Sequence, residues 1–303
     1  MNKRNDFICI GAVHSDYELK LKQNYFKNRT NPINQNENLG GVAFNIAKTL
    51  SFLKEGTKLY SLNCNKNQKK EIRKNGIKFI TLNKKFTKRY YAYILDKKGK
   101  MLLGLANMDN YEKIINSNVS IKVNNKNIIL DLSLSNELIQ KIIKKNFKNN
   151  YICVCGTSAH KIFKIKKLLN KIDLIIMNKQ EAFSLTNKKT INECMNFLVS
   201  KYKKLNFIIT NGKNAVNAYF NNTNYISYPP RIKIKNENGA GDALSAVFNY
   251  FYCNHYDNLE SLNKSICGGA LKVSDHNYSK EKYLQKIDNI SRSIKYKIIN
   301  KYV

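Results

Sequence analysis

The segment at residues 238–242, Asn-Gly-Ala-Gly-Asp, joins a flexible turn to a carboxylate. Small residues let the backbone approach a ligand closely, and residues 239–254 have the pattern of a helix. A helix N-terminus offers free N–H groups and the positive end of a dipole, which together bind anions. Asp242 lies in the first turn, where its carboxylate caps the helix or takes a proton from a hydroxyl held beside the anion. This segment alone leaves both roles open.

A second glycine turn precedes a predicted helix near the N-terminus. Residues 39–47 read Leu-Gly-Gly-Val-Ala-Phe-Asn-Ile-Ala, so Gly40 and Gly41 stand at the helix start and Asn45 lies one turn in. Apolar residues recur at helical spacing from residue 42 to residue 53. Each glycine turn therefore places a polar side chain in the first part of a helix.

Short apolar runs alternate with helical segments along most of the chain and must position these turns. The runs are residues 7–13, 57–62, 127–131, 151–155, 173–177 and 206–210. Strands that are apolar throughout and alternate with helices predict a mostly parallel sheet covered on both faces. We therefore expect an α/β fold of three layers.

Two stretches depart from that alternation. Residues 17–38 are polar and contain no helical pattern, and residues 88–106 read as a hairpin with its turn at Lys97-Lys98-Gly99. Together they predict a small sheet outside the main one, which would form a lid; the alternative is an irregular edge of the same domain. We expect one domain over residues 1–303, with lid segments at about 17–38 and 88–106.

The bulk composition allows a large globular domain and raises one competing function. The formal charge is +32, which favours a nucleic-acid partner. The lysines are spread over the whole chain, however, and are mixed with asparagine and isoleucine, which AT-rich codons also encode. A biased genome therefore explains the charge without a nucleic-acid function.

Seven cysteines are present, without a Cys-x-x-Cys pair, and most lie in apolar segments. We expect them to be buried reduced thiols. No apolar run is long enough to span a bilayer, and the apolar run at residues 7–13 reads as a strand rather than a signal peptide. These features predict a cytoplasmic protein.

The two glycine turns together resemble the paired signature of ribokinase-like (PfkB) sugar kinases. That signature has a Gly-Gly-x-x-x-Asn-x-Ala element early and a Gly-Ala-Gly-Asp element late, in this order and at this spacing. Residues 11–16 resemble the family's opening strand, which ends in a sugar-binding aspartate, here Asp16. Residues 178–181 resemble its Asn-x-x-Glu element, and residues 210–212 its nucleotide-side Thr-x-Gly turn. No Gly-x-x-x-x-Gly-Lys-Ser/Thr loop is present, so the sequence does not support a P-loop kinase.

Within the family, the sequence looks most like the pseudouridine kinases. Asn31-Pro32 precedes the first glycine turn, as a Ser/Thr-Asn-Pro element does in those enzymes. Residues 40–45 closely match the corresponding motif of those enzymes, and residues 91–109 resemble their lid hairpin with the stretch that follows it. The resemblance extends from about residue 7 to residue 275.

The resemblance implies a ribokinase-like three-layer sandwich with a small β lid, and a role for each matching residue. The acceptor-binding residues would be Asp16, Asn31, Gly40, Gly41 and Asn45. Asp242 would be the base that activates the acceptor hydroxyl. The N–H groups of Gly239, Ala240 and Gly241 would hold the charge on the transferred phosphoryl group.

The resemblance also implies ATP and Mg²⁺ as cofactors. ATP would lie against Thr210 and Gly212. Asn178 and Glu181 would order the ion and its waters near the phosphates, so that Glu181 acts on the metal indirectly. The positive surface would help to attract ATP.

The resulting expectation is an ATP-dependent kinase that converts pseudouridine to pseudouridine 5′-phosphate. Ribose and adenosine-like nucleosides are the alternative acceptors, and a nucleic-acid-binding protein on this fold is the alternative of another class. An exposed edge or face of the lid could pair with a second copy, so a homodimer is also expected.

Overall fold

The apolar runs form the central strands of a large sheet in the computed structural model, which describes residues 6–54, 56–113, 119–233, 238–274 and 278–299. Ten described strands are joined in the order β14-β13-β12-β11-β10-β9-β8-β1-β4-β5. Their bounds are β1 Phe7–Ile10, β4 Lys58–Ser61, β5 Lys78–Thr81, β8 Asn127–Asp131, β9 Tyr151–Cys155, β10 Leu174–Asn178, β11 Asn206–Thr210, β12 Val216–Phe220, β13 Thr223–Ser227 and β14 Tyr296–Ile299. The strands from β11 to β5 in this order are parallel, and β12, β13 and β14 continue the sheet antiparallel.

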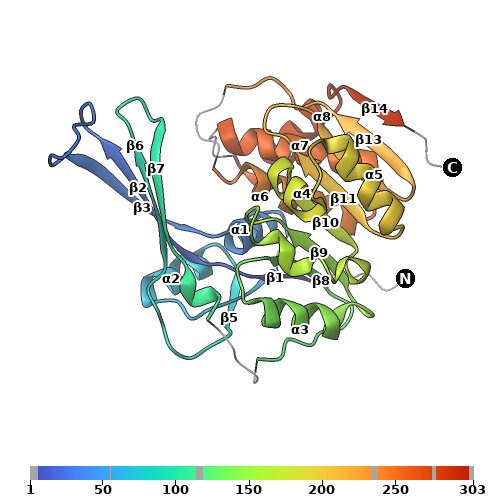
Figure 1. Ribbon diagram of the computed structural model, residues 1–303, viewed down its shortest axis with the longest axis horizontal. Coiled ribbons are helices and arrows are strands. Elements are labelled where there is room, and N and C mark those ends of the chain that lie inside the picture. The colour runs from blue at the N-terminus through green and yellow to red at the C-terminus, as the bar shows by residue number, and fades with distance from the viewer. Residues whose placement is uncertain (1–5, 55, 114–118, 234–237, 275–277, 300–303) are drawn as a thin grey trace.

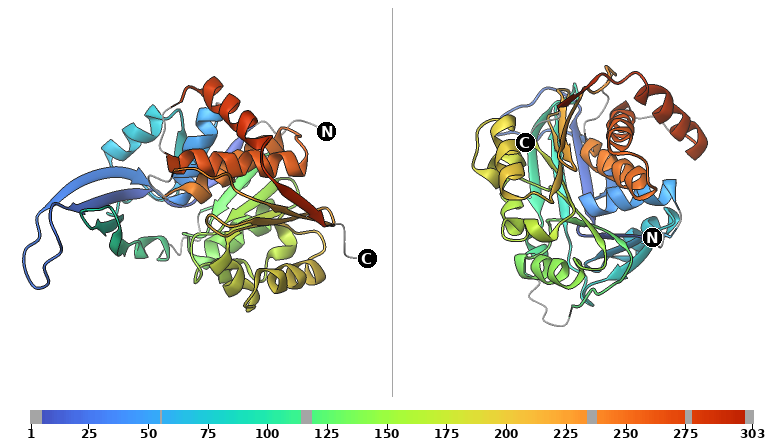
Figure 2. Two further views of the ribbon diagram at one scale, coloured as in Figure 1. Left: turned by 90° about the horizontal axis from the view of Figure 1, so that it is seen from above. Right: turned by 90° about the vertical axis from the view of Figure 1, so that its right-hand side faces the viewer.

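Helices cover both faces of this sheet, because alternate strand residues are apolar on each side. One face packs against α1, α2, α6, α7 and α8, and the other against α3, α4 and α5 (Figure 2). Their bounds are α1 Val42–Leu53, α2 Lys66–Lys74, α3 Asn136–Asn146, α4 Lys179–Thr186, α5 Ile191–Lys201, α6 Ala240–Cys253, α7 Asn258–Ser274 and α8 Lys280–Ser291, with short 3-10 turns at Asp109–Tyr111, Ile162–Ile165 and Leu169–Lys171. The three-layer α/β fold and its mostly parallel sheet are confirmed.

A second sheet of four described strands projects from the main body as a lid (Figure 1). Its order is β3-β2-β6-β7, with β2 His14–Leu21, β3 Ile33–Gly40, β6 Tyr90–Leu95 and β7 Met101–Asn107. Strand β2 pairs antiparallel with β3 and parallel with β6, so the two predicted lid segments meet in one sheet. The expected lid is therefore confirmed.

The first apolar run ends earlier than its composition predicts. Strand β1 stops at Ile10, because Gly11 turns the chain with φ +149°, and β2 already begins at His14. Asp16 consequently lies on the lid sheet and not at the end of a central strand. The lid thus brings its own carboxylate to the edge of the main sheet.

The seven cysteines carry no disulfide, and all are buried except Cys253, which is half-buried. Within the ranges given above, none of the helices combines the length and apolar character needed to cross a membrane.

Candidate active site

The carboxyl ends of the parallel strands meet at one edge of the main sheet, where ligands bind in open α/β sheets. The register fixes which residues share that edge. Asp131 at the end of β8 pairs with Cys155 of β9, and Asn178 at the end of β10 pairs with Thr210 of β11. The predicted elements at residues 178–181 and 210–212 therefore lie side by side.

Asp131 anchors the beginning of α1, a role that sequence reasoning missed. Its Oδ2 accepts the backbone N–H groups of Ala12 at 2.8 Å and Ala43 at 3.0 Å. The N-cap residue of the helix is Gly41, which has φ +114° and no side chain to cap the helix. The buried carboxylate of Asp131 acts as the cap in its place. A Cβ atom at Gly11 would lie 2.1 Å from the carboxyl carbon of Asp131, which explains glycine there.

Tyr111 and Arg89 fasten the loop that leads into the lid. The Tyr111 hydroxyl accepts the Val13 N–H at 2.6 Å and donates to the Val13 carbonyl at 2.7 Å. Arg89 is buried, donates to the carbonyl of Asn63 at 2.9 Å, and lies 5.2 Å from the centre of the Tyr111 ring. The loop between β1 and β2 is thus held from two sides.

Asp16 reaches the site because Gly40 leaves room for it. A Cβ atom at Gly40 would lie 2.0 Å from Oδ2 of Asp16. The other carboxylate oxygen of Asp16 lies 3.0 Å from Nε2 of His14. Any side chain at residue 40 would therefore displace this carboxylate, which makes the glycine a steric requirement.

Asn45 and Asp242 join the two glycine turns across the site. The Asn45 Nδ2 donates to Oδ2 of Asp242 at 2.7 Å, although the residues are far apart in sequence. The side chain of Asp242 therefore bonds to α1 and does not cap its own helix, since α6 has no side-chain cap. The simple capping role left open for Asp242 is not what the structure shows.

The N-terminus of α6 has the features of an anion site. Its N-cap is Gly239, which has φ +78° and no side chain to occupy the first N–H groups of the helix. Among the described residues, no atom lies within 4 Å of a Cβ position at Gly241. The backbone at Gly241 therefore faces space that these residues leave open, while Lys272 and Asn45 lie beside Gly239.

The pKa of Asp242 is raised to about 6, chiefly because the carboxylate is buried. The negative charges of Asp131 and Asp16 raise it further, whereas the bond from Asn45 and the charge of Lys272 lower it. A carboxylate with this pKa is mostly ionised at neutral pH and still accepts a proton readily.

Asn178 and Glu181 first serve the start of α4. They form a capping box, in which the Asn178 N–H donates to Glu181 Oε2 at 2.8 Å and the Glu181 N–H donates to Asn178 Oδ1 at 3.0 Å. Burial raises the pKa of Glu181, as does the charge of Asp242. A Cβ atom at Gly156 would lie 2.0 Å from Oε2, so Gly156 makes room for this carboxylate.

The acidic residues suit a Mg²⁺ that is held mainly by other ligands. Among the described residues, no group of three or more His, Cys, Asp or Glu side chains could hold a metal ion alone. Mg²⁺ in kinases takes one or two carboxylates together with phosphates and water. Glu181 uses Oε2 for its capping bond and fits such an indirect role through its other oxygen.

Thr210 and Gly212 lie on the neighbouring strand end. Thr210 closes β11, and Gly212 has φ +58°, with no atom of the residues that the structure describes within 4 Å of a Cβ position. This glycine turn offers open space beside Asn178, as a nucleotide-binding surface needs.

Asn31 is not brought to the site. It lies in the loop beyond Leu21 and Ile33, which pair at the far end of the β2–β3 hairpin. Leu21 is five strand residues from Asp16, roughly 17 Å at about 3.3 Å per residue. Asn31 Oδ1 accepts from the Phe26 N–H, and its Nδ2 donates to the carbonyls of Phe26 and Arg29, so its amide is occupied within that loop. The predicted contact with an acceptor base therefore finds no support.

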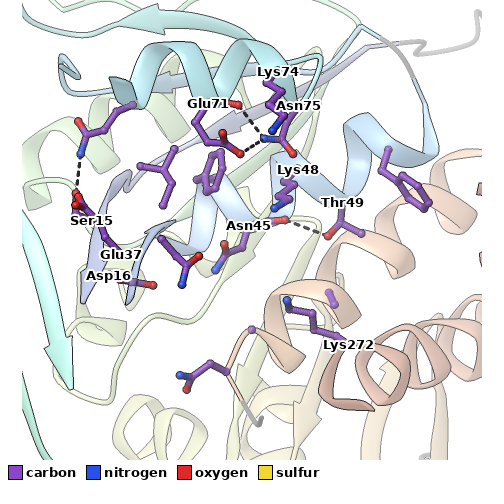
Figure 3. Close-up of a pocket in the computed structure, with 18 of the residues that line it drawn as sticks. Ser15, Asp16, Glu37, Asn45, Lys48, Thr49, Glu71, Lys74, Asn75 and Lys272 are labelled. Carbon is purple, nitrogen blue, oxygen red and sulfur yellow. Dashed lines mark hydrogen bonds between the residues drawn. The ribbon is translucent and has the colours of Figure 1, made fainter. Parts of the chain in front are cut away.

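A cavity of about 1070 Å³ opens between the lid, α1, α2 and the end of α7 (Figure 3). It contains Asp16, Asn45 and Gly239 of the predicted site. It also contains residues that the sequence analysis did not single out as site residues: Ser15, Asn38, Lys48, Glu71, Lys74, Tyr93 and Lys272. Each is a single residue of a common type, so only the folded arrangement identifies it.

Tyr93 of β6 lines this cavity from the lid and bonds to the neighbouring lid strand β2. Its hydroxyl donates to Glu18 Oε2 at 3.1 Å, and burial together with the Glu18 charge raises the pKa of Tyr93 to about 12. Asn38 pairs with Asp16 in the lid sheet and also lines the cavity. The lid thus contributes Tyr93 and Asn38 to the cavity, whereas Asn31 does not line it.

Comparison with known proteins bears on this arrangement. A pseudouridine-metabolizing bifunctional protein of Schizosaccharomyces pombe is 30% identical over 192 residues, which is 59% of this chain. The match spans about a quarter (26%) of that protein.

Solved structures match the whole fold. A carbohydrate kinase from Agrobacterium tumefaciens superposes with a TM-score of 0.80 at 20% identity, covering 97% of this chain and 100% of that one. A ribokinase from Cryptococcus neoformans in complex with ADP gives 0.72 at 12% identity, with 96% and 99% covered. The model of the pfkB family of carbohydrate kinases matches residues 4–281. The chain therefore belongs to the pfkB family of carbohydrate kinases, which are phosphotransferases with a hydroxyl group as acceptor.

Proposed function

We propose that this kinase transfers the terminal phosphate of ATP to pseudouridine and forms pseudouridine 5′-phosphate. The observation that carries the proposal is the 2.7 Å bond between Asn45 and Asp242, which joins a candidate acceptor site to a candidate anion site. The name of the fission-yeast relative supports pseudouridine over other acceptors. Ribose and adenosine-like nucleosides are the alternatives.

The acceptor would lie in the cavity between lid and sheet edge. Asp16 would accept hydrogen bonds from two neighbouring ribose hydroxyls, for which a carboxylate with two oxygens is well suited. Asn45 would orient the sugar and hold Asp242 in place through the same amide. Gly40 makes room for the Asp16 carboxylate, and Gly41 lets the chain pack against the Ala12 carbonyl oxygen, which a Cβ atom would approach to 2.3 Å.

Asp242 would take the proton of the reacting hydroxyl as that oxygen attacks the terminal phosphorus. The N–H groups of Gly239, Ala240 and Gly241 would stabilise the charge on the phosphoryl oxygens. ATP would lie along Thr210 and Gly212, and Glu181 with Asn178 would contact the waters of Mg²⁺. The ion supplies neutralisation of phosphate charge when it is bound.

The lid would exclude water from the phosphoryl group and so limit hydrolysis of ATP. We propose one domain over the whole chain, with the lid as an insertion. We also propose a homodimer through the lid, since Leu103 and Leu105 of β7 are about half exposed and share one side of the strand. Free cysteines fit a reducing compartment, and we place the protein in the cytoplasm.

The test is the rate of ADP formation with pseudouridine, uridine, ribose and adenosine as acceptors. Pseudouridine should give the highest kcat/KM. Asp242→Asn serves as the control for chemistry and should lower kcat roughly 100- to 10,000-fold while nucleotide still binds. Equal kcat/KM for pseudouridine and uridine would contradict the acceptor assignment, and near-normal turnover by Asp242→Asn would remove it as the base.

The charge of +32 favours RNA binding as the second candidate function. A gel shift with RNA at physiological salt separates the two. Tight, salt-resistant RNA binding without turnover of any acceptor would replace the kinase proposal.

A further inference from the structure

Lys272 stands beside the N-terminus of α6, outside every motif that the sequence offers. It lies in the last turn of α7, and its side chain points into the cavity toward Asn45 (Figure 3). Its Cε lies 3.3 Å from a Cβ position at Gly239, while Nδ2 of Asn45 lies 4.0 Å from the same position. The ammonium group is one bond beyond Cε. It is therefore next to the turn that would face a phosphoryl group.

The packing of α7 against α6 determines this position. Gly269 lies one turn before Lys272, and a Cβ atom there would lie 3.1 Å from the carbonyl oxygen of Ala240. The absence of a side chain at Gly269 lets the two helices approach closely at this point. The side chain of Lys272 consequently extends across the beginning of α6.

The charge of Lys272 acts on Asp242 of α6 and on Lys48 of α1. Its positive charge lowers the pKa of Asp242, which shows that the two groups are close enough to interact. Lys48 on α1 also lines the cavity, and its pKa is lowered by burial and then by the charge of Lys272. Glu71 partly offsets this repulsion. Two lysines that repel one another across a cavity are stabilised when an anion binds between them.

We propose that Lys272 is a catalytic residue that donates a charge-assisted hydrogen bond to the terminal phosphoryl group of ATP. In the transfer, the acceptor oxygen forms a bond to the terminal phosphorus. The bond from that phosphorus to the oxygen bridging the second phosphate breaks, and ADP leaves with the electron pair. The hydroxyl proton passes to Asp242, and Lys272 keeps its own proton throughout. The N–H groups of the turn contribute neutral dipoles, and Lys272 adds a full positive charge at the same place.

This inference rests on the proposed phosphoryl transfer but not on the identity of the acceptor. A lysine that contacts the terminal phosphate must discriminate between ATP and ADP. Equilibrium binding therefore tests it without turnover, by calorimetry with Mg-ADP and with the Mg complex of the non-hydrolysable β,γ-imido analogue of ATP.

Lys272→Met keeps the length of the side chain and removes its charge. We expect it to weaken binding of the ATP analogue about tenfold, as for loss of a hydrogen bond to a charged group. Binding of ADP should change less than twofold, and Lys272→Arg should retain most of the preference for the ATP analogue. The matched control is Lys286→Met on α8, an exposed lysine outside the cavity, which should bind both nucleotides like the wild type.

Turnover gives a second readout. Lys272→Met should lower kcat roughly 10- to 100-fold, with the KM of the acceptor unchanged within about threefold. Equal weakening of both nucleotides, or no weakening of either, would overturn the role of Lys272. Failure of the wild type to bind nucleotide would overturn both the role of Lys272 and the kinase proposal. Nucleotide discrimination without turnover of pseudouridine would support Lys272 and refute only the acceptor.

Discussion

The hydrogen bond from Asn45 to Asp242 makes a quantitative prediction about the pH dependence of the kinase. The bond favours the ionised form of Asp242 and is one of the two contacts that lower its pKa. Asn45→Leu removes the donor and keeps the branched shape and the number of side-chain heavy atoms. The pKa of Asp242 should therefore rise from its value of about 6 in the folded protein.

The size of the rise follows from the strength of the bond. A hydrogen bond to a charged group contributes about 1.5–3 kcal/mol, and one pKa unit corresponds to about 1.36 kcal/mol. The carboxylate of Asp242 is buried, but the residue as a whole keeps some exposed surface. The lower part of that range therefore applies, and the pKa should rise by about one unit. The other charged groups near Asp242 are Asp131, Asp16, Lys272 and Glu181, and the substitution leaves all four in place.

The direction of the effect on rate is fixed by the role of the base. A general base works only when it is ionised, so kcat/KM for the acceptor declines as pH falls through its pKa. The acid limb of the profile should move to higher pH by about one unit in Asn45→Leu. Bound ATP adds the same negative charge to both proteins, so the difference between their midpoints is the quantity to measure.

The assay is the initial rate of ADP formation at saturating ATP and low acceptor concentration, over a range of pH at constant ionic strength. Thr49→Val is the matched control, because Thr49 lines the same cavity and donates to the Asn45 carbonyl but makes no contact with Asp242. Its acid limb should stay where the wild type has it. An acid limb that does not move in Asn45→Leu would show that Asp242 is not the titrating base.

Three further substitutions test other parts of the arrangement. Gly241→Val enters space that the protein leaves open, so thermal melting should stay close to that of the wild type while phosphoryl transfer is lost; an active, folded variant would exclude the anion site. Gly40→Ala must displace the Asp16 carboxylate, so the KM of the acceptor should rise roughly tenfold or more, while the KM of ATP should not change. An unaltered acceptor KM would show that Asp16 does not bind the acceptor. Leu103→Lys places a charge on the exposed apolar side of β7 and should convert a dimer to a monomer in light scattering; a monomeric wild type would refute the dimer.

The main sheet could be predicted because its strands are apolar throughout. Strands such as β8 and β9 are buried at every residue, and the sequence carries that fact as uninterrupted apolar runs. The hairpin of β6 and β7 is local in the chain, so its turn was visible as well. The end of β1 could not be predicted from the sequence. The chain turns at Gly11 against the carboxyl group of Asp131, which is far away in the sequence.

The site residues divide in the same way. Those within the two glycine turns were found because their spacing repeats a known pattern, and the structure places them together. Asp131 was missed because its partners Ala12 and Ala43 are 119 and 88 residues away, and only the fold joins them. Asn31 was misplaced because amide chemistry says nothing about the distance from a loop tip to a sheet edge.

The buried carboxylate of Asp131 has two effects that depend on one another. It accepts the N–H group of Ala43 in the first turn of α1 and so helps to fix the helix that carries Asn45. Its charge also raises the pKa of Asp242, to which Asn45 donates. If Asp131 capped α1 from a position farther from Asp242, the pKa of Asp242 would be lower. A carboxylate with a lower pKa is a weaker base. The same side chain therefore anchors the acceptor helix and contributes part of the raised pKa of the candidate base. Any substitution of Asp131 should alter both the position of Asn45 and the ionisation of Asp242.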